Sequence, residues 1–246
     1  MADAPQDGTA PLAEGDAERT RRRAELAEAL ERTRERIAVT GAEPTLVVVT
    51  KFFPAADAAA LVDLGITDIG ENRDQEAAAK VAELEETGHR PARVHFIGQL
   101  QSNKAASVAR YADVVQSVDR VKIVTALEKG ARAAERRLDV LLQVDLAGDD
   151  EGRGGVLPDA LPALAERVAG SDVLDLRGVM AVAPLGGDPD AAFARLADLH
   201  ERLLRDHPEA TWRSAGMSGD LEAALVHGAT HVRVGSAILG ARPRAR

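Results

Sequence analysis

The sequence contains no cysteine, which excludes disulfide bonds, thiolate metal ligands and a cysteine nucleophile. Long apolar runs are also missing, because none approaches the roughly 20 residues that a membrane-spanning helix needs. The first residues, MADAPQDGTAPLAEGDAERT, lack the basic and then apolar pattern of a signal peptide. We therefore expect a cytoplasmic protein that makes no membrane contact.

Positive charge is in deficit as well. The formal net charge of −9 argues against nucleic acid as the main partner, and favours a small molecule or another protein. The six histidines show no metal-ligand spacing. The carboxylates of residues 145–155 lack the alternate spacing of a calcium loop, so we expect no metal and interpret this segment as a mobile loop.

Lysine is scarce, with five lysines against 26 arginines. One of the five, Lys51, directly follows the apolar run LVVVT and precedes FFP. Where arginine is the usual cation, a lysine at this place suggests a use for its amine. The alternative is that Lys51 only marks the point where a strand surfaces into a loop, because charged residues at strand ends are common. The fold decides between the two.

Two regions differ in composition. Residues 1–15 are rich in Ala, Pro, Gly and Asp and are predicted to be disordered, whereas residues 16–246 are predicted to form a single domain. That domain opens with a long helix, whose start Asp16 can cap and whose end Gly41 follows. The apolar positions on one face of this helix are Leu26, Leu30 and Ile37.

After this helix, short apolar runs alternate with stretches rich in Ala, Leu and Glu. Such alternation is typical of parallel strands joined by crossover helices, and eight units in about 250 residues fit a closed (β/α)8 barrel. A doubly wound open sheet is the alternative, but TKFFPAAD after the first strand lacks the usual glycine fingerprint. We therefore predict a (β/α)8 TIM barrel preceded by the long helix. The predicted strands are 45–50, 67–70, 93–98, 113–118, 138–146, 176–182, 211–216 and 230–235, and the predicted helices between them are 55–64, 73–87, 102–110, 120–135, 158–169, 189–206 and 219–227.

Active sites of this fold lie at the carboxyl ends of the strands, which places Lys51 at the barrel mouth. Desolvation there favours the neutral amine, which can attack an aldehyde or ketone and form a Schiff base. Lys104 is expected inside the following helix, facing away from the mouth. His95 lies near the middle of a strand and is expected to be a hydrogen-bonded core residue. The other polar residues expected at the mouth are Glu71, Asn72, Gln99, Gln143, Asp145, Ser214 to Ser218 and Ser236.

Two small-residue turns follow the last two strands. SAGMSGD covers residues 214–220, and VRVGSAILGA covers residues 232–241. In this fold a phosphate is often held by the loops after strands seven and eight, where glycine lets backbone N–H groups approach and serine donates hydrogen bonds. A lysine beside a phosphate site favours a phosphorylated aldehyde or ketone, either pyridoxal phosphate or the substrate of a sugar-phosphate aldolase.

The chain resembles the pyridoxal phosphate homeostasis protein family, a single-domain relative of the fold-type III barrel of alanine racemase. The resemblance spans about residues 20 to 242, and HFIGQLQSNK (95–104) and SAGMSGD (214–220) are its most specific motifs. Further matching segments are VTKFFP, GENRDQE, GRGGV, GVMAV and VRVGSAILGAR.

The resemblance implies a site for pyridoxal 5'-phosphate. Lys51 would form the Schiff base, Arg233 would lie against the pyridine nitrogen, and Asn72 would contact the cofactor. Serine stands at position 236, where threonine is common in the family, and keeps the hydroxyl. The residues that would hold the phosphate are Ser214, Gly216, Met217, Ser218, Gly235 and Ser236.

The same resemblance implies a cofactor-binding and delivery protein, with apo-enzymes that use pyridoxal phosphate as acceptors. Racemisation would need a second base, which in alanine racemase is a tyrosine from an additional β-domain of the partner subunit. The lone tyrosine here, Tyr111, is expected on the opposite rim, and an arginine such as Arg233 cannot protonate the pyridine nitrogen. We expect a monomer with little or no catalysis. The alternatives are a pyridoxal-phosphate-dependent racemase or lyase and a cofactor-free Schiff-base aldolase.

Overall fold

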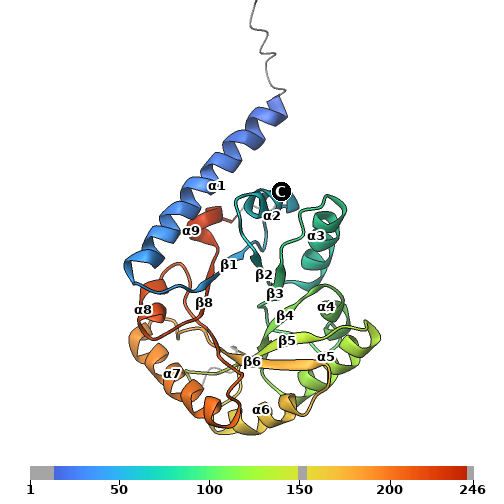
Figure 1. The fold of residues 1–246 in the computed structure, drawn as a ribbon, viewed down its shortest axis with the longest axis vertical. Coiled ribbons are helices and arrows are strands. Elements are labelled where there is room, and N and C mark those ends of the chain that lie inside the picture. Colours follow the sequence, from blue (N-terminus) through green and yellow to red (C-terminus); the bar gives the residue numbers. More distant parts are fainter. Residues whose placement is uncertain (1–13, 149–153, 243–246) are drawn as a thin grey trace, which may run out of the picture.

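A closed barrel of eight parallel strands forms the centre of the computed structural model, which describes residues 14–148 and 154–242. Each strand pairs with the next, and β8 (His231–Val234) closes the barrel against β1 (Thr45–Val49). Helices surround the strands as an outer ring (Figure 1). The (β/α)8 prediction is therefore confirmed, and the open-sheet alternative is wrong.

The remaining elements follow the predicted alternation, with boundaries that differ by a few residues. The strands are β2 (Asp68–Glu71), β3 (Arg93–Phe96), β4 (Val114–Val118), β5 (Leu138–Gln143), β6 (Leu174–Met180) and β7 (Trp212–Ser214). The helices are α2 (Ala55–Asp63), α3 (Asp74–Glu86), α4 (Ala105–Tyr111), α5 (Val121–Ala133), η1 (Pro158–Ala160), α6 (Leu161–Ala169), α7 (Pro189–Asp206), α8 (Leu221–Val226) and α9 (Ser236–Leu239).

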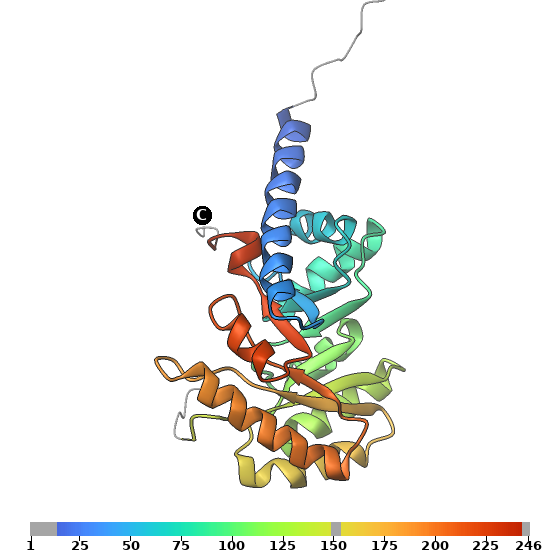
Figure 2. The same cartoon turned by 60° about the vertical axis from the view of Figure 1, so that its left-hand side comes forward.

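The N-terminal helix α1 (Glu14–Val39) begins two residues before the predicted start, and Gly41 follows its end with a left-handed φ of 73°. Its predicted apolar face is confirmed, because Leu26, Leu30 and Ile37 are buried. Figures 1 and 2 show α1 lying along α9 and α8, with its first turns projecting past the barrel. The predicted disorder of residues 1–15 is wrong for residues 14 and 15, which lie in α1, and residues 1–13 lie outside the described residues.

Side chains of α1 also bond to neighbouring helices. Arg22 pairs with Asp57 of α2 at 2.8 Å and donates to the carbonyl of Leu239 at the end of α9 at 3.1 Å. Arg36 forms two hydrogen bonds with the Glu222 carboxylate of α8 and donates to the Ser218 carbonyl. The helix therefore ties together the elements that flank the first and last strands.

The core has two compartments. A large apolar cluster lies between the strands and the surrounding helices, whereas Val114, Leu141 and Met180 form a small cluster inside the barrel, with Trp212 packed against it. The barrel interior also holds buried polar side chains, although branched apolar residues usually dominate there. These interior polar residues are Asp68, His95, Gln116, Ser214, His231 and Arg233. No helix within residues 14–148 and 154–242 is both long and apolar enough to cross a membrane.

Candidate functional site at the barrel mouth

Lys51 lies two residues after the last residue of β1 and is half-buried at the carboxyl end of the strand. Val47 and Val49 of β1 pack against Gly70 inside the barrel, and Lys51 lies two residues beyond Val49, in the turn that follows the strand. Within residues 14–148 and 154–242, no hydrogen bond or ion pair occupies its amine. The structure thus places the amine where the fold carries its chemistry.

The backbone before Lys51 is held by a buried ion pair. Lys80 of α3 bonds to the Glu71 carboxylate at 2.6 Å and to the Thr50 carbonyl at 2.7 Å, and the Thr50 hydroxyl donates to Glu71 at 2.6 Å. Burial raises the pKa of Glu71, while Lys80 and Thr50 act to lower it. Glu71 ends β2 at the predicted rim, but its side chain does not join the mouth, because it follows inward-facing Gly70 by one residue and so points outward, toward α3.

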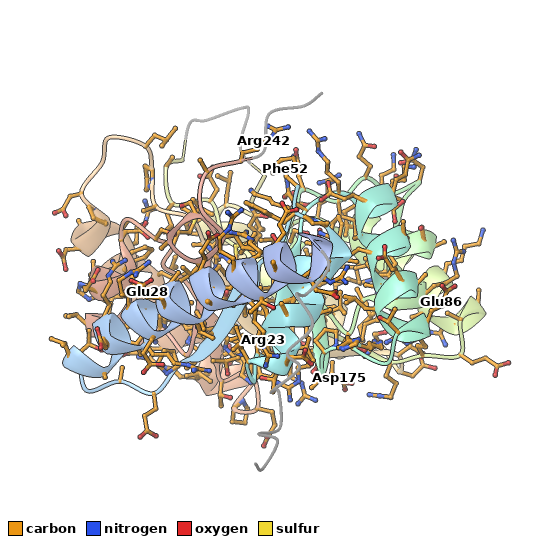
Figure 3. All side chains as sticks on the ribbon, turned by 90° about the horizontal axis from the view of Figure 1, so that it is seen from above. Arg23, Glu28, Phe52, Glu86, Asp175 and Arg242 are labelled. Atoms are coloured by element: carbon orange, nitrogen blue, oxygen red, sulfur yellow. The ribbon has the colours of Figure 1, made fainter. Side chains whose placement is uncertain are left out.

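The backbone after Lys51 is held as well. Phe52 has a φ of 71°, a left-handed conformation that is uncommon outside glycine, and its N–H donates to the carboxylate of Glu76. Arg242 places its guanidinium 3.8 Å from the Phe52 ring, and the two residues lie side by side in Figure 3. The peptide units on both sides of Lys51 are therefore fixed by side chains from α3, which limits the positions its amine can reach.

Two hydroxyls meet near the carboxyl end of β1. The Oγ atoms of Ser218 and Ser236 lie 3.3 Å apart, and the Ala237 N–H points to Ser218 Oγ at 3.4 Å. Gly235 packs directly on β1, because a Cβ there would lie 3.3 Å from the Cβ of Val49. The two turns expected to hold a phosphate are thus brought together, next to the strand that ends in the lysine.

Glycine is required at the base of the first turn. Gly216 has a φ of 89°, and a Cβ on it would lie 2.6 Å from the Cβ of Ala224. Met217, the next residue, is exposed and donates its N–H to Asp220 at 2.6 Å. This geometry folds the turn back over the start of α8 and directs Ser218 toward Ser236.

Arg233 is buried inside the barrel and is held by two acceptors. Its Nη1 donates to Ser214 Oγ at 2.6 Å, and its Nη2 donates to the Ala181 carbonyl at 2.8 Å. Burial lowers the pKa of Arg233 to about 10, so the guanidinium is still charged at neutral pH. Ser214 is completely buried beside Arg233, and the structure does not bring it to the Ser218 and Ser236 hydroxyls.

Asn72 lies at the mouth after β2, where its backbone packs on Gly98. A Cβ at Gly98 would lie 2.2 Å from the Asn72 carbonyl oxygen, so only glycine permits this contact. Asn72, Gln99 and Lys104 line a cavity of about 410 Å³. The expected position of Lys104 is wrong, because a turn delays α4 and leaves Lys104 before the helix, 3.7 Å from Asp74 at the start of α3.

Two further cavities lie at opposite ends of the barrel. One of about 580 Å³ is lined by Gln99, Gln143 and Met217, so it opens beside the Ser218 turn. A larger one of about 840 Å³ is lined by the starts of the strands, including Asp68 and Arg93. The larger cavity lies at the end opposite the lysine, and size alone therefore does not identify the site.

Other candidate groups are arranged as follows. Tyr111, at the end of α4, is buried, and burial together with the Asp74 and Glu71 carboxylates raises the pKa of its phenol. Among the described residues, no three His, Cys, Asp or Glu side chains gather closely enough to hold a metal ion. Residues 149–153 of the predicted mobile loop (145–155) lie outside the described residues, whereas Val156, just after the loop, bridges to Val144 beyond β5.

Comparison with known proteins places the chain in a family. The model of the alanine racemase N-terminal domain matches residues 22–243. The pyridoxal phosphate homeostasis protein of Mycobacterium tuberculosis is 44% identical over 244 residues, which cover 90% of this chain and 94% of that protein. The protein of the same name from Pseudomonas aeruginosa is 41% identical, with coverage of 88% and 94%. The chain therefore belongs to the alanine racemase N-terminal domain family and, within it, to the pyridoxal phosphate homeostasis proteins.

Solved structures agree with this assignment. The structure of PipY from Synechococcus elongatus, determined with pyridoxal phosphate bound, is 33% identical with a TM-score of 0.78, and the match covers 87% of this chain and all of that chain. Alanine racemase from Streptomyces coelicolor matches with a TM-score of 0.66 at 22% identity, over 89% of this chain and 58% of that chain. The second likeness concerns the fold alone.

Several residues that shape the site were not predicted. The sequence around Lys80 and Glu76 indicates only a helix with an ordinary charged surface. Gln116 stands out only as one polar residue in an apolar strand. The GENRDQE motif carried a signal, because its carboxylates lie on both sides of Asn72, but only the packing of α3 shows what they bind. His95 is a hydrogen-bonded core residue, as predicted.

Proposed function

We propose that the chain binds pyridoxal 5'-phosphate as a Schiff base on Lys51, and that it serves intracellular vitamin B6 homeostasis by holding and delivering this cofactor. The observation that carries the proposal is that three groups lie toward the carboxyl ends of the neighbouring strands β7, β8 and β1. These are the amine of Lys51, which no described residue engages in a hydrogen bond or ion pair, the paired hydroxyls of Ser218 and Ser236, and the charged guanidinium of Arg233. The bound cofactor in PipY supports this choice of ligand.

The residues present fit the parts of the cofactor. The aldehyde requires an amine, which Lys51 supplies, and the phosphate requires hydroxyl and backbone donors, which the Ser218 and Ser236 turns supply. The pyridine nitrogen requires a donor, and a guanidinium can only donate. Bound pyridoxal phosphate supplies an electron-withdrawing ring, and Arg233 would leave its nitrogen unprotonated and so make it a weak electron sink.

Little or no catalysis follows from this arrangement. A racemase needs a base on each face of the substrate carbon, and Lys51 would provide one. Tyr111 does not provide the other, because it is buried and its pKa is raised. A racemase or lyase remains the alternative function, and it is distinguished by whether loaded protein exchanges the α-hydrogen of an amino acid.

The covalent site can be tested by reducing the loaded protein with borohydride and mapping the labelled peptide. The pyridoxyl group is expected on Lys51, and Lys51→Arg is expected to remain unlabelled. Lys104→Arg is the matched control, because Lys104 lines a cavity at the same mouth and should be dispensable. A label carried by Lys104 alone, or by Lys122, would contradict the proposal.

A further inference from the structure

A chain of hydrogen bonds crosses the barrel interior and ends at Arg233. Arg233 Nη1 lies 2.6 Å from Ser214 Oγ, which lies 2.7 Å from Gln116 Oε1. Gln116 Nε2 lies 2.9 Å from His95 Nδ1, and His95 Nε2 lies 2.8 Å from Asp68 Oδ1. The five side chains come from five different strands, and each is at most 4% exposed.

With the Gln116 carboxamide oriented as the structure has it, the donor and acceptor roles along these four hydrogen bonds follow from elementary chemistry. A guanidinium can only donate, so Ser214 Oγ accepts from Arg233 and must donate its own proton to the Gln116 carbonyl oxygen. The Gln116 amide then donates to His95 Nδ1, which must be unprotonated. His95 is left as the neutral tautomer with its proton on Nε2, and donates that proton to the Asp68 carboxylate. All four bonds therefore point the same way, from Arg233 to Asp68.

Such a network is costly unless every member is satisfied, because buried polar groups lose their bonds to water. The carboxylate at its end is well suited to this task. Burial acts to raise the pKa of Asp68, but hydrogen bonds from His95 and Thr67 outweigh that effect and lower it. Asp68 therefore stays an acceptor at neutral pH, and this fixes the direction of all four hydrogen bonds.

At the other end of the hydrogen-bond chain, the bonds of Arg233 determine which of its nitrogens can donate to a ligand. Ser214 occupies Nη1, and the Ala181 carbonyl occupies Nη2 at 2.8 Å. Among the described residues, Nε has no hydrogen-bond partner. Ser214 also has both of its roles filled, since it accepts from Arg233 and donates to Gln116.

We propose that Asp68, His95 and Gln116 are positioning residues, which act through Ser214 to hold Arg233 with its Nε–H directed at the pyridine ring of the cofactor. Ser214 is then part of the ring-facing apparatus and does not bind phosphate. This inference rests on the proposed function, because it takes pyridoxal phosphate as the ligand that Arg233 faces.

The first test compares binding of pyridoxal and pyridoxal phosphate. Gln116→Met removes both amide bonds while keeping the side-chain length, and Ser214→Ala removes the bond next to Arg233. Each variant should weaken both ligands by the same factor, about tenfold, and should shift the absorbance maximum of the bound cofactor. Ser214→Thr keeps the hydroxyl and should restore the wild-type spectrum. Wild-type affinity and spectrum in Gln116→Met and Ser214→Ala would overturn the inference, as would weakening confined to the phosphorylated ligand.

The second test measures the protonation of His95 without any ligand, and its one substitution hardly changes the shape of the side chain. Nitrogen NMR of the unloaded wild-type protein should show His95 neutral, with its proton on Nε2. Gln116→Glu places a second carboxylate at Nδ1 and should make His95 doubly protonated. A proton on Nδ1 in the wild-type protein would overturn the inference. If wild-type protein failed to bind pyridoxal phosphate, the proposed function would fail, while this measurement would still decide the direction of the chain.

Discussion

The side chains of Ser218 and Ser236 test the phosphate site most directly. Together, Ser218→Ala and Ser236→Ala should weaken pyridoxal phosphate far more than pyridoxal, because the latter has no phosphate to bind. Each hydrogen bond to a charged group contributes about 1.5–3 kcal/mol, so each substitution should cost roughly tenfold or more in affinity for the phosphorylated form. Titration of the two ligands measures the difference. Equal weakening would mean that the serines only maintain the turns.

His231 should make stability depend on pH. Burial lowers the pKa of His231 from its ordinary value of 6.5 to about 4. Between these pH values the unfolded chain binds a proton that the native state excludes. The contribution of His231 to the free energy of unfolding is therefore complete above about pH 6.5 and is lost as the pH drops toward 4. The loss should be on the order of 3 kcal/mol.

The measurement is denaturant unfolding of the wild-type protein and His231→Asn at several pH values between about 7 and 4. The variant should lose this part of the pH dependence, even if the ring contact with Trp212 is also lost and lowers its stability at every pH. His89→Asn, at the half-exposed pair with Asp63, serves as the control. A parallel pH dependence in wild type and His231→Asn would show that His231 does not cause it.

Helix α1 is positioned to support the phosphate turn from outside the barrel. Arg36 donates to the Ser218 carbonyl at 3.2 and 3.1 Å and pairs with Glu222 at 2.7 Å. Arg36→Met should loosen the turn, raise hydrogen exchange in residues 214–220, and weaken pyridoxal phosphate about fivefold, the loss expected for about one hydrogen bond.

The matched control is Arg32→Met on the same helix. Arg32 is exposed and pairs with Glu28 within the helix, at 2.5 Å, and such surface pairs contribute little. Arg32→Met should leave both the hydrogen exchange of residues 214–220 and the affinity for pyridoxal phosphate unchanged. If the two variants behaved alike, α1 would be a covering helix without influence on the site.

The barrel as a unit determines whether the bound cofactor is held or used. On the proposed function, in which Lys51 carries the cofactor and Arg233 faces its ring, loaded protein should transfer pyridoxal phosphate to an apo-aminotransferase. In deuterated water it should exchange the α-hydrogen of alanine far more slowly than about 1–10³ per second, the usual range of enzyme turnover. Activity of the acceptor enzyme and the proton spectrum of alanine report the two outcomes. Rapid exchange with loss of stereochemistry would instead establish a racemase.

The order of elements could be predicted because its causes are local. Apolar runs of strand length, helical stretches rich in Ala and Glu, and the absence of a glycine fingerprint are all read along the chain, and they led to the eight-fold barrel. Lys51 could be placed at the mouth for the same reason, since the end of a parallel strand is known as soon as the strand is. The turns at Ser218 and Ser236 followed from their glycines and their position after the last two strands.

Which side chains meet was decided by packing between strands and helices far apart in sequence. Glu71 stands one residue from Asn72, yet the pleat directs it outward to Lys80. Lys104 lies before α4, 3.7 Å from Asp74, because a turn of a few residues precedes the helix. Ser214 and Gln116, 98 residues apart, bond inside the barrel only because closure brings β4 and β7 to face each other. The order of residues along the chain therefore indicated which end of the barrel carries the candidate site. Barrel closure determined which side chains bond to one another there.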